Sequence, residues 1–345
     1  MDVKKYFMHQ KMMTNVLYAL LPIILMAVYF YGWRVIVMLA VSILAAVLAE
    51  YGVMRLVQKE KTKVTEACLV SAVLFVLTLP PATPLYIVVI GIVFGIIFGK
   101  SVFGGFGRNI FNPALVGRAF VYIAFPYHLA LAWTQPFLEL PGGFAKYQAT
   151  ADMISQATPL IAMKSGEAAA LDLKSLLFGM HAGSIGETAR LLILLGAFFL
   201  IYTKTASWQI MLATMAGAAV AEGVFQVAGV ISEPFYVYLM NGGLLFAAVF
   251  MATDPVSAPK NNWAKWVCGA LIGIFAMVIR TFSLFAEGVM FAVLIVNALT
   301  PLIERQLSQL QAKQKAKAQV AKAPAAAAAT PASPAAPAAP AQKED

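Results

Sequence analysis

The sequence predicts an all-α polytopic membrane protein with about ten transmembrane helices, some short or broken, in two inverted five-helix repeats. Three observations predict it: the composition, the spacing of the apolar stretches, and a match between the two halves of the chain. Of the 345 residues, 61% are hydrophobic and only 12% are charged, and the mean hydropathy is +0.79. Soluble domains carry about 25% charged residues, so the composition excludes an ordinary soluble enzyme.

The net charge of +9 does not indicate a nucleic-acid partner. An excess of Lys and Arg on so apolar a chain is typical of the cytoplasmic loops of a membrane protein, so the expected surroundings are membrane lipid. Cys68 and Cys268 both lie in apolar stretches. Two such cysteines exclude a disulfide framework and a cysteine-based metal site within the chain.

Ten apolar stretches are candidates for crossing the membrane, which takes about 20 residues as a helix. Seven are long enough to cross alone: 14–33, 35–56, 84–103, 189–204, 207–227, 263–282 and 286–304. Three more are short or are interrupted by Pro and Gly: 67–80, 112–126 and 235–254.

Basic residues predict the side of the membrane that each connecting segment faces, because cytoplasmic loops are enriched in Lys and Arg. If the N-terminus is cytoplasmic, every basic loop falls on that side, whereas 127–188, with three lysines and five acidic residues, falls outside. We therefore expect both the N-terminus and the C-terminus in the cytoplasm.

This topology divides the chain into four parts. They are a first membrane repeat (1–126), an extracytoplasmic segment (127–188), a second membrane repeat (189–305) and a disordered cytoplasmic tail rich in Lys, Ala and Pro (306–345). The tail has too few large apolar residues to bury a core.

The two halves match without gaps at an offset of 175 residues. The pairs that stand out from the apolar background are Thr78 with Thr253, Pro80 with Pro255, Pro84 with Pro259, and Trp33 with Trp208. Five crossings per half is an odd number, so the second copy enters the membrane from the opposite side, as in many transporters. The alternative is coincidence between two apolar segments.

Prolines interrupt both halves at equivalent places, 78–84 and 253–259. Backbone of this kind is tolerated at membrane depth only where it is buried in protein or lines a cavity. Its freed carbonyl groups can coordinate a cation or shape a path for one. Asp254 is either a carboxylate on such a path or an ordinary loop residue at the cytoplasmic edge.

Polar residues around 104–118 form one candidate site. Asn112 precedes Pro113 and is a fair N-cap for the next helix. Alternatively, the amides of Asn109 and Asn112 bind a polar ring such as a flavin or a quinone. Arg118 falls inside a predicted span, where a charge indicates a functional or paired role.

Two polar stretches lie in and just after the predicted outside segment. Asp152 to Pro159 is a turn-prone stretch in which the proline holds Thr158 extended. Gly183, Ser184 and Glu187 precede a span, where they can bind an anion or cap the helix. The usual nucleotide and nucleophile motifs are absent, which argues against ATP-driven transport by this chain.

At five ordered motifs the chain resembles the RnfD protein of the Rnf electron-transport complex and its relative, the NqrB protein of the sodium-translocating NADH:quinone oxidoreductase. The motifs are NIFNPALVGRAF (109–120), DMISQATPL (152–160), GSIGET (183–188), LIYTKTASW (200–208) and MATDPVSAP (251–259). The resemblance covers nearly all of residues 10–305. The span before residue 33 begins near residue 14, without the N-terminal extension usual in NqrB, which favours the Rnf type; other motifs read equally well as NqrB.

The resemblance implies a membrane subunit of a redox-driven ion pump that carries FMN. In this family a separate flavin transferase joins FMN by a phosphoester to the threonine of a D-x-x-S-G-A-T pattern. Asp152, Ser155, Ala157 and Thr158 match it, and Gln156 stands where the family usually has glycine. Thr158 is therefore the expected attachment site, and it lies in the segment expected outside the cytoplasm.

The resemblance also implies further binding residues and partners. Asn109 and Asn112 match an amide pair implied in holding a second, non-covalent flavin (riboflavin or FMN). Arg118, Gly183, Ser184 and Glu187 complete the candidate cofactor-binding set. The chain should work with the other subunits of a multi-subunit complex and couple electron transfer to the transport of Na+ or H+. A non-redox secondary transporter and a flavin-free paralogue are the alternatives.

Overall fold

The computed structural model describes residues 7–58, 63–130, 133–147, 177–179, 181–187, 189–231, 239–283 and 288–327, with the backbone alone for 57–58, 130 and 316–327. This part of the chain is mostly helical. A single pair of parallel two-residue strands is assigned in it, β1 (Phe7–Met8) and β2 (Val64–Thr65). The expectation of an almost purely helical chain is confirmed at this level.

Five helices are long and apolar enough to cross a membrane. They are α1 (Lys11–Tyr31), α2 (Arg34–Gln58), α10 (Trp208–Val227), α13 (Asn262–Phe282) and α14 (Val289–Ala327). Shorter apolar helices are α3 (Glu66–Leu77), α4 (Leu85–Ile96) continued by the π-helical turn η2 (Ile97–Ser101), α5 (Pro113–Ala124) and α9 (Arg190–Tyr202). The chain is thus a multi-pass membrane protein, and the number of crossings stays a prediction.

The helix breaks occur where the prolines predicted them. α3 ends at Leu77, one residue before the first break. In the second half, α12 (Leu244–Phe246) and the π-helical turn η5 (Ala247–Met251) end just before the second break. Both breaks interrupt a helix because proline removes an amide donor and its ring prevents the next turn from forming.

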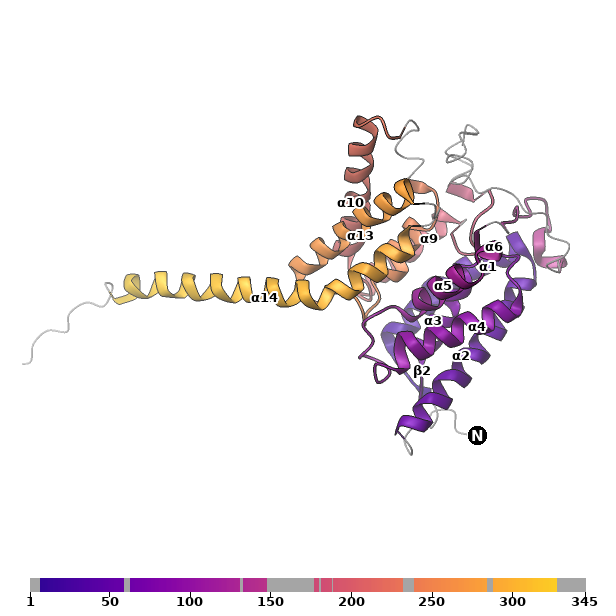
Figure 1. Cartoon of the computed structure of the whole chain (residues 1–345), viewed down its shortest axis with the longest axis horizontal. Helices are drawn as coiled ribbons and strands as arrows, with labels where there is room; N and C mark the ends of the chain where they lie inside the picture. The colour runs from indigo at the N-terminus through magenta and orange to yellow at the C-terminus, as the bar shows by residue number, and fades with distance from the viewer. Residues whose placement is uncertain are drawn as a thin grey trace, which may run out of the picture.

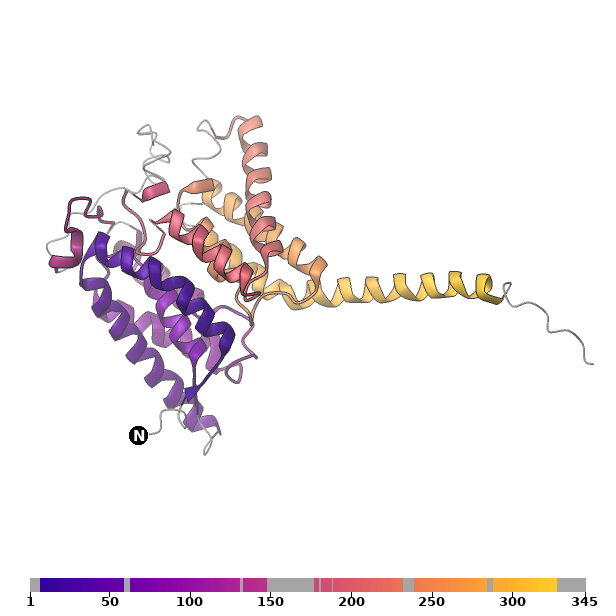
Figure 2. The same cartoon turned by 180° about the vertical axis from the view of Figure 1, so that it is seen from behind.

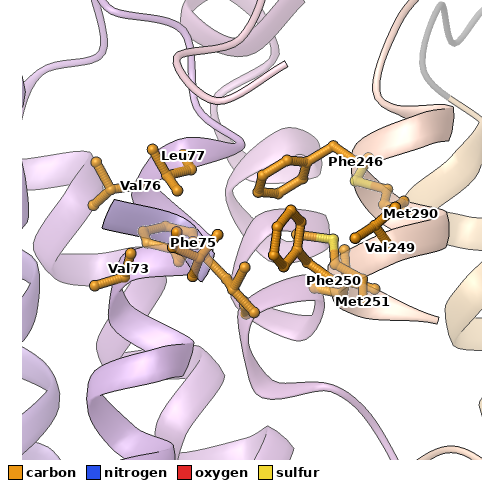
Figure 3. Close-up of a cluster of buried hydrophobic side chains, with 14 of the residues drawn as sticks. Val73, Phe75, Val76, Leu77, Phe246, Val249, Phe250, Met251 and Met290 are labelled. Atoms are coloured by element: carbon orange, nitrogen blue, oxygen red, sulfur yellow. The ribbon is translucent and has the colours of Figure 1, made fainter. Parts of the chain in front are cut away.

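The helices form two bundles that lie side by side (Figures 1 and 2). In the first, α2 packs against α3 and α4, and α4 packs against α5; in the second, α10 packs against α13, and α13 against α14. Between the bundles, α1 contacts α9, and α5 contacts α14. At the centre, α3 faces α12 and η5 across a cluster of buried apolar side chains (Figure 3).

Small residues allow the closest helix pairs to approach backbone to backbone, as is usual in membrane bundles. On α10 and α13, a Cβ atom added at Gly217 would meet the carbonyl oxygen of Ala270, and one at Gly273 would meet that of Thr214. Gly95 of α4 is pressed in the same way against the carbonyl oxygen of Pro113.

The described part of 127–188 includes the helix α6 (Pro126–Ala130) and the 3-10 turn η3 (Gly142–Ala145). Residues 133–147 cover the turn between α1 and α2, where the Trp33 amide donates to the Lys146 carbonyl at 3.1 Å and the Phe137 amide to that of Phe30 at 2.8 Å. This stretch therefore belongs to the first bundle.

The expectation of a disordered tail from 306 is wrong for its first part, because α14 continues to Ala327 and projects from the bundle as a lone helix (Figure 1). The reason is helix propensity. The stretch that follows the span is rich in Leu, Gln, Ala and Lys, which are strong helix formers, and it extends a helix that is already nucleated.

We expect Gly217→Ala to destabilise the protein, whereas Gly223→Ala on the same helix should not. A methyl group at 217 overlaps the Ala270 carbonyl, but a Cβ at Gly223 has no atom within 4 Å. Overpacking of this kind costs about 1–3 kcal/mol. Thermal unfolding of the purified protein in detergent measures the difference; equal midpoints for the two variants would contradict the close approach of α10 and α13.

Candidate functional site

A buried ion pair lies at the beginning of α3. The Lys100 ammonium group is 2.7 Å from the Glu50 carboxylate, and both side chains are 2% exposed. Thr65 bridges the pair, because its hydroxyl accepts from Lys100 and donates to Glu50 at 3.0 Å. A charge of either sign is costly in this apolar interior unless it is paired and hydrogen-bonded, and here both conditions are met. We call Glu50, Thr65 and Lys100 the Lys100 cluster.

The local structure explains how these three side chains meet. Glu50 lies on α2, Thr65 immediately precedes α3, and Lys100 lies in η2 at the end of α4. Lys100 lies near the end of the predicted span 84–103, where the π-helical turn keeps it within the helix and its side chain buried.

Asn109, Asn112 and Asp254 lie beside the Lys100 cluster. All three line one cavity of about 20 Å³ together with Lys100 and Ser71. The Asp254 carboxylate accepts from the hydroxyl of Ser257 at 2.8 Å. The tertiary structure therefore joins the second helix break to the predicted amide pair, although they are far apart in the sequence.

Both amides have structural roles in this arrangement. The Asn112 side chain accepts from the Ala114 amide at 3.0 Å, which confirms it as the N-cap of α5. The Asn109 amide donates to the Phe111 carbonyl at 3.0 Å. The cavity holds about one water molecule, so a flavin ring does not fit between these residues.

A second polar group lies at the other end of α3. Arg118 of α5 is 3.8 Å from the Glu187 carboxylate, with both side chains buried. Arg190 of α9 lies nearby and donates to the Met240 carbonyl, and its guanidinium is 2.9 Å from the His181 ring. We call Arg118, Glu187 and Arg190 the Arg118 cluster. The prediction that Arg118 is an intramembrane charge with a partner agrees with this geometry.

The segment 183–187 joins the Arg118 cluster to the first helix break. The Gly186 amide donates to the Leu77 carbonyl at 2.7 Å, and the Ile185 amide to the Leu79 carbonyl at 3.1 Å. Ser184 and Glu187 are buried, and Gly183 is half-buried. Because these two amides donate to carbonyls at the C-terminal end of α3, the segment caps that helix. The prediction that Gly183, Ser184 and Glu187 bind an anion gains no support from this arrangement.

The predicted flavin-attachment residues Asp152, Ser155, Ala157 and Thr158 lie outside the described residues, as does Gln156. Sequence reasoning missed Glu50 as a buried partner, and it missed Glu222 and Arg280, which are 0% and 1% exposed on α10 and α13. All three fall inside predicted apolar spans. A charge within a span was the signal that could have found them.

The fold and the paired interior charges define a class, the multi-pass membrane proteins with ionisable groups inside the bundle. Residues 3–313 match the NQR2, RnfD, RnfE family, and the chain belongs to this family.

Its similarity to known proteins agrees with that membership. The chain is 40% identical over 263 residues to the B subunit of the Na(+)-translocating NADH-quinone reductase of Azotobacter vinelandii, covering 74% of this chain and 63% of that protein. It is 40% identical over 267 residues to the protein of the same name from Pseudoalteromonas atlantica (74% and 62%) and 38% over 266 residues to that from Pseudomonas aeruginosa (73% and 62%). The chain thus spans less than two thirds of the length of these relatives.

We expect Glu50→Gln to be strongly destabilising, because it leaves the Lys100 charge buried without a counter-charge. Breaking a buried pair in this way costs about 3–5 kcal/mol, whereas replacing both partners by apolar residues is often neutral. Thermal unfolding should therefore show a large loss for Glu50→Gln and recovery in Glu50→Leu/Lys100→Met. Arg55→Gln, an exposed position on the same helix, is the control. A double variant as unstable as the single one would contradict the pairing.

Proposed function

We propose that this chain is a membrane subunit of an ion-translocating oxidoreductase complex, with FMN joined covalently to Thr158, and that it couples electron transfer to the movement of Na+ or H+. The observation that carries the proposal is the pairing of two broken helices across an apolar barrier, with charged clusters at both ends, in a chain of this family. Its D-x-x-S-x-A-T stretch at 152–158 retains the flavin acceptor.

The two bundles are inverted repeats of five helices each. At the offset of 175 residues, α1 corresponds to α9, α2 to α10, α3 to α12 with η5, α4 to α13, and α5 to α14. The contacts between the bundles join corresponding elements, α1 with α9 and α5 with α14. Contacts between equivalent elements are what a two-fold axis produces, and ten helical segments in two copies account for ten crossings.

The inversion is supported by the direction of the two short helices. The C-terminal end of α3 lies against residues 185–186. The N-terminal end of α12 lies against Glu187, because a Cβ atom added at Gly243, just before α12, would meet the Glu187 carboxylate. The opposite ends also lie together, because Ala67 and Asp254 line the same cavity. The helices α3 and α12–η5 are therefore antiparallel, as inverted repeats require.

An apolar barrier separates the two charged clusters. The ring of Phe75 on α3 packs against Gly91 of α4, whereas its counterpart at the repeat offset, Phe250 of η5, lies beside Phe246 with ring centroids 5.1 Å apart (Figure 3). Together the three rings form an apolar barrier along the two short helices. All three are at most 4% exposed. A cation that moves between the Lys100 cluster and the Arg118 cluster must pass these rings, so movement of the two short helices relative to each other would open and close the path.

The bound FMN would supply one- and two-electron chemistry, and this chain's own residues would hold the flavin and gate the ion. In the proposed topology, the chain lies in a bacterial inner membrane with both termini in the cytoplasm and residues 127–188 outside. Partners are the other subunits of the complex and a flavin transferase. The relatives reported above all carry the name of the quinone-reductase protein, which favours that alternative over the Rnf type.

We expect the chain, co-expressed with a flavin transferase in a secretion-competent host, to give a fluorescent band on a denaturing gel under ultraviolet light. Thr158→Ala should abolish the band, because the phosphoester needs that hydroxyl. Thr150→Ala, in the same segment, should keep it. A dark wild-type band beside a labelled control substrate, or an unmodified mass for the peptide containing Thr158, would favour a non-redox transporter or a flavin-free paralogue.

We expect Phe250→Ala to lower the number of cations moved per electron in the reconstituted complex, because a smaller side chain leaves the barrier open in both positions of the helices. Phe250→Leu retains more packing and should show a smaller effect. Phe198→Ala, on the exposed face of α9, should leave the ratio unchanged. Proteoliposome uptake measured beside electron transfer gives the ratio; an unchanged ratio in a folded Phe250→Ala complex would exclude this barrier as the gate.

A further inference from the structure

A basic cavity lies at the ends of three membrane helices, away from both charged clusters. Its volume is about 430 Å³, within the range of about 300–1,000 Å³ typical of small-molecule pockets. It is bounded by the turn between α9 and α10, which contains the LIYTKTASW motif, and by the second helix break up to the first turn of α13. The proposed function assigns no role to it.

The cavity is strongly positive. Its lining includes the three lysines Lys204, Lys260 and Lys265 and no acidic residue. Within the described chain, none of these ammonium groups has a carboxylate within ion-pair distance. Two carboxylates next to the cavity are bound by other groups: Glu304 accepts from the backbone amides of Lys260 and Asn261, and Asp254 accepts from Ser257.

The backbone around the cavity adds to its preference for an anion. The N-terminus of α10 borders it, and the hydroxyl of the N-cap residue Ser207 donates to the Gln209 side chain at 3.0 Å instead of capping a backbone amide of the first turn. The open amides and the helix dipole at such an end favour negative charge. Lys204 has a left-handed backbone with φ of 53°, and the amides of Lys204 and Thr205 hold this turn on the end of α9, at 3.0 and 2.9 Å.

The corresponding region of the first bundle is filled by the chain itself. There Arg34 binds the Pro81 and Thr83 carbonyls at 3.0 and 2.8 Å. The Trp33 amide and indole nitrogen donate to the carbonyls of Lys146 and Phe144 in the covering segment 133–147. At the repeat offset, Lys204, Lys260 and Lys265 replace Tyr29, Leu85 and Ile90, and Gln209 replaces Arg34. This comparison between the two bundles rests on the proposed repeat. The existence of the cavity and its positive charge do not depend on that proposal.

The depth of the cavity indicates where its occupant comes from. It lies where α9 ends and where α10 and α13 begin, that is, at the boundary between hydrocarbon and water. Trp208 and Trp266, which are 50% and 36% exposed, pack edge to face beside it with ring centroids 5.7 Å apart. Exposed tryptophans of this kind mark the level of the lipid headgroups, and basic pockets between helices at this level suit phosphate-bearing headgroups.

We propose that this cavity binds the phosphate of an anionic phospholipid headgroup, with Lys204 and Lys265 as its counter-charges. The lipid takes the place that 133–147 and Arg34 occupy in the first bundle, and it ties the second helix break to the membrane surface. The chemistry recognised is a phosphate anion, and the location selects a lipid over a free ion as its source.

The test uses the assembled complex purified in nonionic detergent, titrated with phosphatidylglycerol or phosphatidylcholine and examined by native mass spectrometry. We expect retention of phosphatidylglycerol in preference to phosphatidylcholine. The Lys204→Gln/Lys265→Gln variant should bind it roughly 30-fold more weakly, because each lysine near an anionic headgroup contributes about fivefold. Lys204→Arg/Lys265→Arg should retain it.

Two controls keep the result specific. The charge-matched variant Lys63→Gln/Lys313→Gln, at exposed positions, should bind like the wild type, and size-exclusion chromatography should show that every variant assembles. If the double glutamine variant does not assemble, the single variant Lys204→Gln is used for the same binding measurement. Equal retention by the wild type and the glutamine variants would overturn the site, and displacement by millimolar inorganic phosphate without any preference for phosphatidylglycerol would overturn the lipid as its occupant.

Discussion

Inside a membrane bundle, each amide and carbonyl group freed by a helix break must find its partner within the protein, because no water is available to take that role. The first break shows how this is done. Arg34 binds two of its carbonyls, and the amides of Ile185 and Gly186 bind two more at the end of α3. A proline-containing break therefore brings polar groups from distant parts of the chain to one place.

The same requirement places the charges. Glu50 and Lys100 are buried as a hydrogen-bonded pair at one end of α3, and Arg118 and Glu187 lie together at the other. Since α3 has 12 residues, its ends are about 18 Å apart at 1.5 Å per residue. Between them the helix contributes only apolar side chains and Ser71. This alternation of polar ends and an apolar middle is what a gated ion path needs, because the charged ends lower the cost of entry and the rings prevent free leakage.

The two halves satisfy the constraint differently, and the difference gives the molecule a direction. In the first half Arg34 binds two carbonyls of the break, and residues 133–147 cover the adjoining turn between α1 and α2. In the second half the corresponding region is a cavity lined by lysines. With the proposed inverted repeats, the two halves would present a closed surface at one membrane face and a basic recess at the other.

The sequence by itself determined the membrane class, the positions of the helices and their breaks, the N-cap at Asn112 and the buried charge at Arg118. These follow from local signals: apolar length, proline, capping residues and charge within a span. Only the tertiary structure decided that Lys100 pairs with Glu50, that Asp254 lies beside Asn109 and Asn112, that 183–187 closes α3, and that α14 continues beyond the bundle. The first three join segments distant in the sequence, and pairing across such distances has no local signature. The last depended on a helix already nucleated in the span, which let a polar, Lys- and Ala-rich stretch continue it where composition alone indicated no fixed structure.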